Sequence, residues 1–446
     1  MDSFENSYTN KIPYDDTPIF RKNSIDKQSK SLKTKIFSVI FVLMFIMNIA
    51  LMITCAIYLQ NGKIKQVNIY NDKYSTQTVT HLVDSMRSAK AHSVCVAAGL
   101  GANGINILQG DKLTNSQFYS YTKSHGAGFL YKIVGDSAYF VTCYHVINYQ
   151  EDESLANNNR IWVLPASMLV PLEVELVGYS KTDDVAVLKY THSNILETLE
   201  GCTPVDVYDS TFLSEYEDVF TIGNPLNYGL TGTNGKITAF RQIVTMSGVK
   251  YSWIKTNAAI NPGNSGGALY NANGQFIGMV NANIPETSTG DPVSNIAFAI
   301  PGRLVSSIAD NIIENNIGLT KPVMVNLGIT FGVDEIMGIE RYKDVYQDQD
   351  GNYKDVEQQY VIIKSFDNNS LAKSAGLKEG DRIVSVELML YGNDEPLLVP
   401  ILNQYSFYEY AYAIVPSSFM KFNIARQNEF NETISMSVSV RATKYS

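Results

Sequence analysis

The segment 261–269, NPGNSGGAL, surrounds Ser265 with small residues: Gly263 precedes it, and Gly266 and Gly267 follow it. Asn, Pro and Gly start and permit tight turns, so a simple turn would account for this composition. A catalytic serine would account for it equally well, because such a serine needs close backbone approach and neighbouring amide N–H groups that stabilise an oxyanion. The nucleophile interpretation therefore requires a base and an acid elsewhere in the chain.

Two other segments offer that base and that acid. His145 lies in VTCYHVI at the end of a hydrophobic run, and Asp184 lies in KTDDVAVLKY just before an alternating one. Alone, each is more typical of a structural histidine or a strand cap. Together with Ser265 they can act as a unit, because imidazole takes the serine proton and the carboxylate fixes the imidazole. Their order along the chain is the chymotrypsin-like order. The amides of Gly263 and Ser265 would then form the oxyanion hole, with Asn264 as the turn residue between them.

From about Ser93 onward the chain consists of short β-rich runs separated by turn residues, among them SVCVAAG, GAGFLYKI, SAYFVTCYHVI, DVAVLKY and DVFTIG. Many short strands at this spacing predict an antiparallel barrel or sandwich. Residues 301–318 have apolar side chains at helical spacing and predict one amphipathic helix that ends at Gly318. Residues 75–93 predict a shorter helix on the same grounds.

A second, smaller α/β region follows Lys321-Pro322, which resembles a linker. The runs VMVNLGITFGV, QQYVIIKSF and DRIVSVELML predict strands, and MKFNIARQ and ETISMSVSV predict a closing pair of strands. The runs SLAKSAGL and NQYSFYEYAYAIV predict helices. Between the first two strands, ERYKDVYQDQDGNYKDVE is polar, and we interpret it as a long insertion.

Size and charge narrow the function classes. The chain has 446 residues, which suggests two or three domains, and its 45% hydrophobic and 18% charged residues are typical of a globular protein. A net charge of −9 without a basic patch argues against nucleic-acid binding. No metal-ligand spacing or nucleotide-binding loop is present, so no cofactor is expected.

Residues 36–59 contain no charged side chain and predict a transmembrane helix. At ~1.5 Å per residue the segment is about 36 Å long, more than the roughly 30 Å of a hydrocarbon core. A cleaved signal peptide or lipidation at Cys55 is a weaker alternative. Basic residues outnumber acidic ones before the segment, which predicts a cytoplasmic tail over 1–35, a stalk over 60–85 and extracytoplasmic domains beyond.

At this point the chain resembles the membrane-anchored HtrA/DegP serine proteases. The resemblance covers about residues 75–446 and rests on VTCYHVI, DDVAVLK, IKTNAAINPGNSGGAL, TIGNPLNYGLTGTNGKIT and IAFAIP in that order. It implies a mostly β protein with a trypsin-like double β-barrel over 86–318 and a PDZ domain over 322–446. It also implies ATP-independent endopeptidase activity on misfolded protein and assembly into a homotrimer.

Two binding sites follow from the same resemblance. Ile260, Ile284 and Ile296 match positions of the primary specificity pocket, and their apolar side chains imply cleavage after small aliphatic residues. Ordinary core packing is the alternative for these three. The segment Leu327, Gly328, Ile329 and the run SLAKSAGLKEGDRIVSVE resemble a PDZ domain, where the loop amides would bind a peptide C-terminal carboxylate and the peptide would add as a strand.

Three departures from the family pattern concern activation rather than the triad. Asn257 stands where an Asp is common, Cys143-Tyr144 replaces smaller residues before His145, and Arg241 is one position earlier than the usual arginine. In addition, the polar segments 100–125 and 282–295 are interpreted as regulatory loops.

Cysteine usage excludes a disulfide scaffold. The chain has four cysteines, of which Cys55 lies in the apolar segment, so Cys95, Cys143 and Cys202 leave at least one thiol free or paired between chains. We expect all three to be small buried hydrophobes.

Two functions of different classes remain. The first is an extracytoplasmic serine endopeptidase of protein quality control. The second is a membrane-anchored chaperone or peptide-binding protein that acts mainly through its PDZ domain, with a weak or latent protease. An esterase that uses the same triad is a third, weaker possibility. The presence of Ser265, His145 and Asp184 together favours the first.

Overall fold

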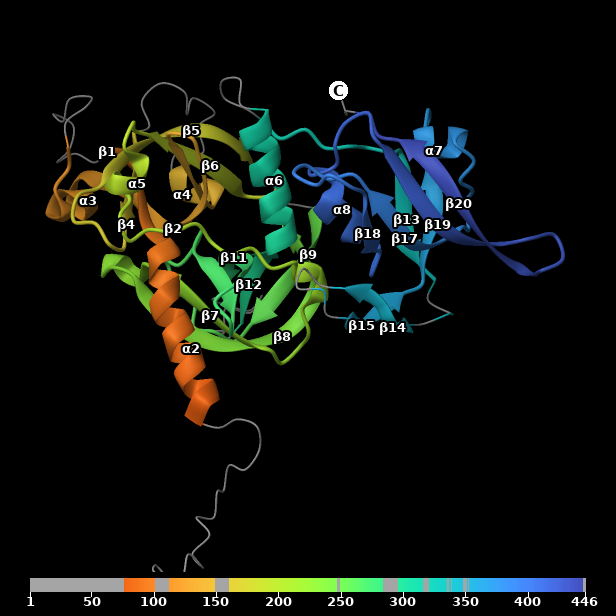
Figure 1. Ribbon diagram of the computed structural model, residues 1–446, viewed down its shortest axis with the longest axis horizontal. Coiled ribbons are helices and arrows are strands. Elements are labelled where there is room, and N and C mark those ends of the chain that lie inside the picture. The colour runs from red at the N-terminus through yellow and green to blue at the C-terminus, as the bar shows by residue number, and fades with distance from the viewer. Residues whose placement is uncertain are drawn as a thin grey trace, which may run out of the picture. The chain divides into compact units, whose positions relative to one another are not determined.

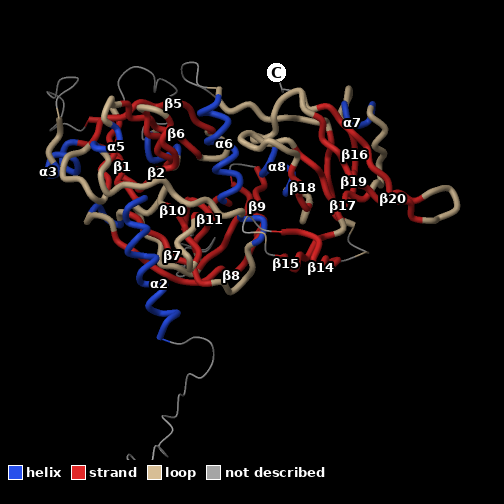
Figure 2. Tube along the Cα trace, viewed as in Figure 1, coloured by secondary structure: helices blue, strands red, loops and turns tan. Residues whose placement is uncertain are grey.

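The structure is a computed structural model that describes most of the chain beyond Ser75. The described residues are 76–100, 112–148, 160–246, 249–283, 296–315, 321–334, 337, 339–347, 351 and 353–443. Strands dominate this part of the chain (Figure 2).

The first barrel is closed by six antiparallel strands in the order β1-β2-β3-β6-β5-β4 (Figure 1). Their bounds are β1 Ser93–Leu100, β2 Thr122–Val134, β3 Ser137–Thr142, β4 Ile161–Pro165, β5 Leu172–Ser180 and β6 Val185–Thr191. Val, Leu and Phe side chains fill its interior, and β1, β3, β4 and β6 are buried at consecutive positions, so that both of their faces are covered.

The second barrel has the same number of strands, in the order β10-β11-β12-β9-β8-β7. Their bounds are β7 Asp218–Gly223, β8 Thr231–Met246, β9 Val249–Thr256, β10 Ala268–Asn271, β11 Phe276–Asn283 and β12 Ala297–Pro301. Strand spacing alone left a barrel and a sandwich open, and the two closed strand orders confirm the double β-barrel that the resemblance implies.

Helices cover the barrels. The bounds are α2 Thr76–Ala89, α3 Asn115–Tyr121, α4 Tyr144–Ile147, α5 Ile195–Thr198 and α6 Gly302–Glu314, with short 3-10 turns η1 Lys90–His92, η3 Ser210–Phe212 and η4 Pro225–Asn227. Leu304, Val305, Ile308 and Ile312 of α6 are buried in the main core, so the helix predicted over 301–318 is confirmed in its central part. Leu82 and Met86 of α2 also pack on this core, and the domain boundary expected at residue 85 falls within α2.

The C-terminal region forms one antiparallel sheet in the order β13-β16-β17-β19-β20, with β18 beside β17. The bounds are β13 Ile329–Val333, β16 Val361–Phe366, β17 Arg382–Leu388, β18 Leu397–Pro400, β19 Phe419–Gln427 and β20 Thr433–Arg441, with helices α7 Leu371–Ser374 and α8 Ser406–Ala411. Phe407, Tyr410 and Ala411 of α8 pack in the core of this region.

The polar run interpreted as a long insertion lies between β13 and β16 and forms a separate two-stranded sheet, β14 Ile339–Gln347 with β15 Tyr353–Gln359. The insertion is confirmed, and cross-strand pairing satisfies its backbone despite the polar side chains. The segment 100–125, interpreted as a loop, contains α3, which begins with a capping box at Thr114. The predicted transmembrane segment 36–59 lies outside the described residues, and no helix within the described ones has the length and apolarity needed to span a membrane.

Candidate active site

The turn that carries Ser265 requires two of its glycines. Gly263 has φ +100°, and a Cβ there would lie 2.1 Å from the carbonyl oxygen of Asn224. Gly266 has φ +84°, and a Cβ there would lie 2.3 Å from the carbonyl oxygen of Ala127. Any other residue at either position would combine an unfavourable backbone conformation with a backbone clash. The glycines that drew attention in the sequence therefore serve close packing as well as the turn.

Backbone hydrogen bonds fix Ser265 at the seam between the two barrels. The Ala127 N–H of β2 donates to the Ser265 carbonyl over 2.9 Å, and the Gly266 N–H donates to the Val280 carbonyl of β11 over 2.8 Å. Strands of both barrels therefore hold the nucleophile, and its position does not depend on a loop alone.

The amides on either side of Asn264 are available as oxyanion donors. Neither the Gly263 nor the Ser265 N–H has a hydrogen-bond acceptor among the described residues. The Asn264 N–H instead donates to the Asn261 carbonyl over 3.0 Å, which closes the turn. The predicted oxyanion hole thus has two free donors and one turn residue, which is the arrangement that stabilises a tetrahedral oxyanion.

His145 and Asp184 come together from two elements of the first barrel. His145 lies on α4, directly after β3, and Asp184 lies in the turn between β5 and β6 with φ +56°. The Asp184 Oδ2 accepts from His145 Nδ1 over 2.6 Å, and Oδ1 accepts from the His145 backbone N–H over 2.8 Å. This pairing places the proton on Nδ1 and leaves Nε2 able to accept the proton of a nucleophile.

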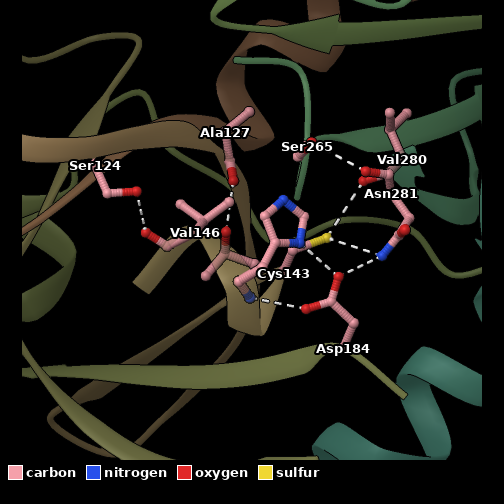
Figure 3. A network of polar contacts seen from close by, with 10 residues as sticks. Ser124, Ala127, Cys143, Val146, Asp184, Ser265, Val280 and Asn281 are labelled. Atoms are coloured by element: carbon pink, nitrogen blue, oxygen red, sulfur yellow. Dashed lines mark hydrogen bonds and ion pairs between the residues drawn. The ribbon is translucent and has the colours of Figure 1, made fainter. Parts of the chain in front are cut away.

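Asn281 is a fourth member of the site that the sequence analysis missed. Its Nδ2 donates to Asp184 Oδ2 over 2.5 Å, and its carbonyl accepts from Ser265 Oγ over 3.0 Å (Figure 3). Within the described residues, no hydrogen bond joins Ser265 Oγ to His145. The resting hydroxyl therefore points to the Asn281 carbonyl. The available signal was the end of the apolar run FIGMVNAN, which carries two asparagines, Asn281 and Asn283, and Asn281 is only 4% exposed.

Asp184 sets the basicity of His145. Partial burial acts to lower the pKa of His145, but the hydrogen bond and the negative charge of Asp184 outweigh it, so the pKa is raised above its ordinary 6.5. The carboxylate thus makes the imidazole a stronger base and stabilises the imidazolium that forms when it takes a proton.

Cys143 lies beside this pair. It is fully buried, its thiol donates to the Val280 carbonyl over 3.5 Å, and burial together with the charge of Asp184 raises its pKa well above the ordinary value. The Cys143, His145 and Asp184 ligand atoms lie within 4.8 Å of one another and are the group of described residues that could hold a metal ion. Because His145 and Asp184 already bind each other and the thiol is protonated, the geometry favours the triad.

The other cysteines give a mixed result. Cys95 and Cys143 are buried free thiols, as expected. Cys202 is also free but only partly buried, so the expectation that all three are buried was wrong for this residue. It lies just after a short helix near the surface, where its sulfur contacts the hydroxyl of Ser167 over 3.1 Å.

The residues predicted to line a specificity pocket are only partly visible. Ile260 is half-buried against the core of the second barrel, and Ile296 packs against the main core. Ile284 lies outside the described residues. The pocket therefore stays a prediction.

The segment predicted to bind a peptide carboxylate has one of its amides occupied, and its role stays a prediction. Leu327 is buried, Gly328 has φ +63°, and Ile329 begins β13, an edge strand that pairs with β16 alone among the described strands. The Gly328 N–H donates to Asn326 Oδ1 over 2.8 Å. An open strand edge beside this loop suits strand addition, but the Asn326 side chain would have to release this amide first.

Two of the departures from the family pattern have structural roles. Asn257 Oδ1 accepts from the Lys236 N–H over 2.6 Å, which ties β8 to the segment before the nucleophile turn. Arg241 has φ +59° and donates to the Thr211 carbonyl over 2.7 Å. Burial lowers the pKa of Arg241 to about 10, against the opposing charge of Glu409 on α8.

Comparison with known proteins finds a peptidase-domain match and similar serine proteases. Residues 126–279 match the family model of the trypsin-like peptidase domain, a range that includes His145, Asp184 and Ser265. Serine protease Do-like HtrA of Lactobacillus helveticus is 33% identical over 270 residues, which cover 60% of this chain and 59% of that protein. Serine protease Do-like HtrB of Bacillus subtilis is 31% identical over 270 residues, covering 58% and 52%.

Among solved structures, HtrA-type protease AlgW with tripeptide is similar with a TM-score of 0.48 at 20% identity, over 82% of this chain and 97% of that one. The chain spans about half to three-fifths of the length of the curated relatives it matches. The peptidase-domain match and the sequence relatives, taken with the assembled site, support a serine endopeptidase. Residues 126–279 thus match a trypsin-like peptidase domain, and the chain is similar in sequence to serine proteases of the HtrA type.

Proposed function

We propose that this protein is a serine endopeptidase that needs no ATP and degrades misfolded or exposed polypeptides outside the cytoplasm. The observation that carries the proposal is the bond between His145 Nδ1 and Asp184 Oδ2, next to a turn in which the Gly263 and Ser265 amides have no acceptor among the described residues. Base, acid, nucleophile and oxyanion donors then lie at one seam, as acyl transfer requires.

The reaction begins with a rotation of the Ser265 hydroxyl away from the Asn281 carbonyl. His145 Nε2 takes the hydroxyl proton while Oγ attacks the scissile carbonyl, and the amides of Gly263 and Ser265 receive the oxyanion. The imidazolium then protonates the leaving amine, and the C–N bond breaks to give an acyl-enzyme. His145 then takes a proton from a water molecule, whose oxygen attacks the ester carbonyl. The bond between the acyl carbon and Ser265 Oγ breaks, the acid product leaves, and the imidazolium returns the proton to Ser265 Oγ.

Cleavage after small aliphatic residues is the specificity that we propose. Ile260, Ile284 and Ile296 would line the pocket, where bulky apolar side chains leave room for Val or Ala and offer no charge for Lys or Arg. The half-buried position of Ile260 beside the nucleophile turn supports this assignment.

The remaining parts of the chain fit a membrane-anchored protease. We propose that residues 36–59 span the cell membrane once with the N-terminus in the cytoplasm, and that residues 322–446 bind peptide C-termini as a PDZ domain. A homotrimer is the proposed assembly. The apolar, uncharged run over 36–59 and the open edge of β13 support these assignments.

A second candidate function is a chaperone or peptide-binding protein with a latent protease. The specific observation in its favour is that the Ser265 hydroxyl is bonded to Asn281 and not to His145. In this case the C-terminal region would hold clients, and hydrolysis would be slow until the hydroxyl turns.

The test compares the full chain with its Ser265→Ala variant on a reduced, alkylated protein substrate, with the native substrate as the reference. We expect the parent to cut the unfolded substrate and the variant to lose several orders of magnitude in rate. Mass spectrometry of the fragments should show Val or Ala at the new C-termini. Equal cleavage by both proteins would refute the peptidase assignment, and binding without cleavage would favour the second candidate.

A further inference from the structure

Two consecutive acidic residues in the β5–β6 turn, Asp183 and Asp184, contact different parts of the protein. Asp184 contacts His145 in the active site, while Asp183 is turned to the C-terminal region and is only 3% exposed. Because the two residues share a peptide bond, the orientation of one backbone unit constrains both. The turn is also conformationally demanding, since Asp184 has φ +56°.

Two tyrosines of the C-terminal region bind Asp183. The Tyr408 hydroxyl donates to Asp183 Oδ1 over 2.7 Å, and the Tyr412 hydroxyl donates to Asp183 Oδ2 over 2.9 Å. Tyr408 lies in α8 and Tyr412 directly follows it, so their four-residue spacing puts both on one helix face. The Ser180 hydroxyl supplies a third hydrogen bond to the same carboxylate.

The helix that carries these tyrosines is firmly seated on the barrels. The Ser307 hydroxyl of α6 donates to the Glu409 carbonyl over 2.8 Å, and Asn311 Nδ2 donates to the Tyr412 carbonyl over 2.7 Å. The Tyr412 ring belongs to the main hydrophobic core of the barrels, whereas Phe407 on the other face of α8 packs in the core of the C-terminal sheet. The helix is therefore shared by both cores.

A buried carboxylate needs all of its hydrogen bonds. An ionised group left without partners away from water costs several kcal/mol, so a lost donor is replaced by movement of the carboxylate toward solvent. At Asp183 such a movement would turn the peptide unit that also positions Asp184. The Tyr144 N–H donates to the Asp184 carbonyl over 3.2 Å, so the same movement would reach the helix of His145.

We propose that Asp183 is a positioning residue of the active site, through which the docked α8 face formed by Tyr408 and Tyr412 holds Asp184 in its productive orientation toward His145. The C-terminal region thereby supports catalysis in the docked state. This inference rests on the proposed peptidase function. The effect of Asp183 on the environment of His145 can nevertheless be measured without any turnover of substrate.

The direct readout is the titration of His145 in the full chain, followed by NMR of the imidazole and assigned with a His145→Ala variant. In the described part of the chain, the titratable groups that lie beside His145 are Asp184 and the protonated Cys143, so loosening Asp184 must weaken the support of the imidazolium. We expect the pKa of His145 to fall in the Tyr408→Phe/Tyr412→Phe double variant, and kcat to fall about tenfold with little change in KM. This loss lies well below the about 10⁴-fold loss expected when the acid itself is removed.

The matched control is Tyr410→Phe. Tyr410 lies on the same helix, and its hydroxyl bonds to the Thr211 hydroxyl over 2.6 Å, away from the triad. This variant loses one contact between α8 and the barrels, so it reports the cost of weaker docking alone. We expect it to leave both the His145 titration and kcat unchanged.

Each outcome is decisive. An unchanged His145 titration in a double variant that stays folded would overturn the inference, even if kcat fell. An equal shift in Tyr410→Phe would also overturn it, because the effect would then follow docking and not Asp183. If the double variant does not fold, the single variants Tyr408→Phe and Tyr412→Phe replace it, each with a smaller shift in the same direction. Absence of turnover in the parent would contradict the proposed function and leave the titration result valid.

Discussion

The active-site seam and the α8 interface are held together by different means. At the seam, glycines with positive φ and backbone hydrogen bonds fix Ser265, so the geometry depends on the main chain. At the α8 interface, side-chain hydroxyls and a buried charge cluster of Asp209, Arg303, Arg241 and Glu409 make the contacts. The geometry of the seam is therefore encoded within one short motif, whereas the α8 interface forms only when residues far apart in the sequence come into contact.

The largest effect is expected at the acid of the seam. Asp184→Asn should reduce kcat by about 10⁴-fold while the fold is retained, because an amide cannot fix the required tautomer of His145 or support its positive charge. Steady-state kinetics on the unfolded substrate would measure this loss. Asp136→Asn, in an exposed turn, is the control and should keep the parent rate. A loss below about tenfold in Asp184→Asn would remove Asp184 from the triad.

A backbone substitution breaks the seam more selectively. Gly263→Ala should lower kcat by about 10²–10³-fold, the range typical of a lost oxyanion donor, because the turn must move to avoid the Asn224 carbonyl. Gly135→Ala is a matched control: Gly135 also has positive φ, but a Cβ there meets nothing within 4 Å. It should cost some stability and no activity. Equal activity losses in both variants would show that strain, and not the oxyanion turn, is responsible.

A smaller effect is expected at Asn281. Asn281→Ala removes the side-chain donor to Asp184 and keeps the backbone carbonyl that accepts from Ser265. We expect a loss of about tenfold in kcat, because partners that orient a catalytic group typically contribute about 10–100-fold. Asn271→Ala, which alters a turn at the far end of β10, serves as the reference. Unchanged kinetics in Asn281→Ala would show that Asp184 needs no further support.

The pH dependence of activity reports the basicity of His145. Because the pKa of His145 is raised, kcat/KM should fall as the pH decreases through a midpoint above 6.5, when the imidazole becomes protonated. A pH profile between 5 and 9 measures this midpoint. A midpoint clearly below 6.5 would contradict the supporting role of Asp184 in the free enzyme.

At the α8 interface the expected effect concerns stability and leaves catalysis aside. Burial raises the pKa of Glu409 to about 7, with the charge of Arg241 opposing the increase. The folded state then binds more protons than the unfolded state between pH 4.5 and 7, so stability falls as the pH rises through this window. Glu409→Gln should abolish this fall and raise stability at pH 8 by up to about 3 kcal/mol. Urea unfolding at pH 4.5 and pH 8 is the test, and an identical pH dependence in both proteins would refute it.

The residues of the active-site seam could be predicted from the sequence because each lies in a short, recognisable segment. NPGNSGGAL holds the glycines that the turn requires, and the segments around His145 and Asp184 hold the other two groups within a few residues. The double β-barrel was predicted from the ordered motifs of the resemblance, whereas strand spacing alone could not separate a barrel from a sandwich because strand periodicity does not encode closure. Asn281 was missed, since one polar residue in an apolar strand gives no indication of its partner.

The contacts of the α8 interface could not be predicted from the sequence, for a different reason. Tyr408 and Tyr412 were predicted to lie on a helix, but nothing in their pattern says that they bind Asp183, more than two hundred positions earlier in the chain. The insertion was predicted, but the hairpin β14–β15 within it was not. Its polar side chains show no strand pattern, and its strands pair through the backbone. Local sequence patterns do not show which distant residue a polar group will bind.

The most direct test of the central claim is covalent labelling of the full chain with a phosphonofluoridate, a reagent that reacts with activated serines. Intact-mass and peptide mass spectrometry would count the adducts and locate them. We predict a single adduct, on Ser265. It should be lost in His145→Ala, and it should form more slowly as the pH falls through the His145 titration. A folded protein that is not labelled, or labelling of Ser265 that is unaffected by His145→Ala, would contradict a working triad.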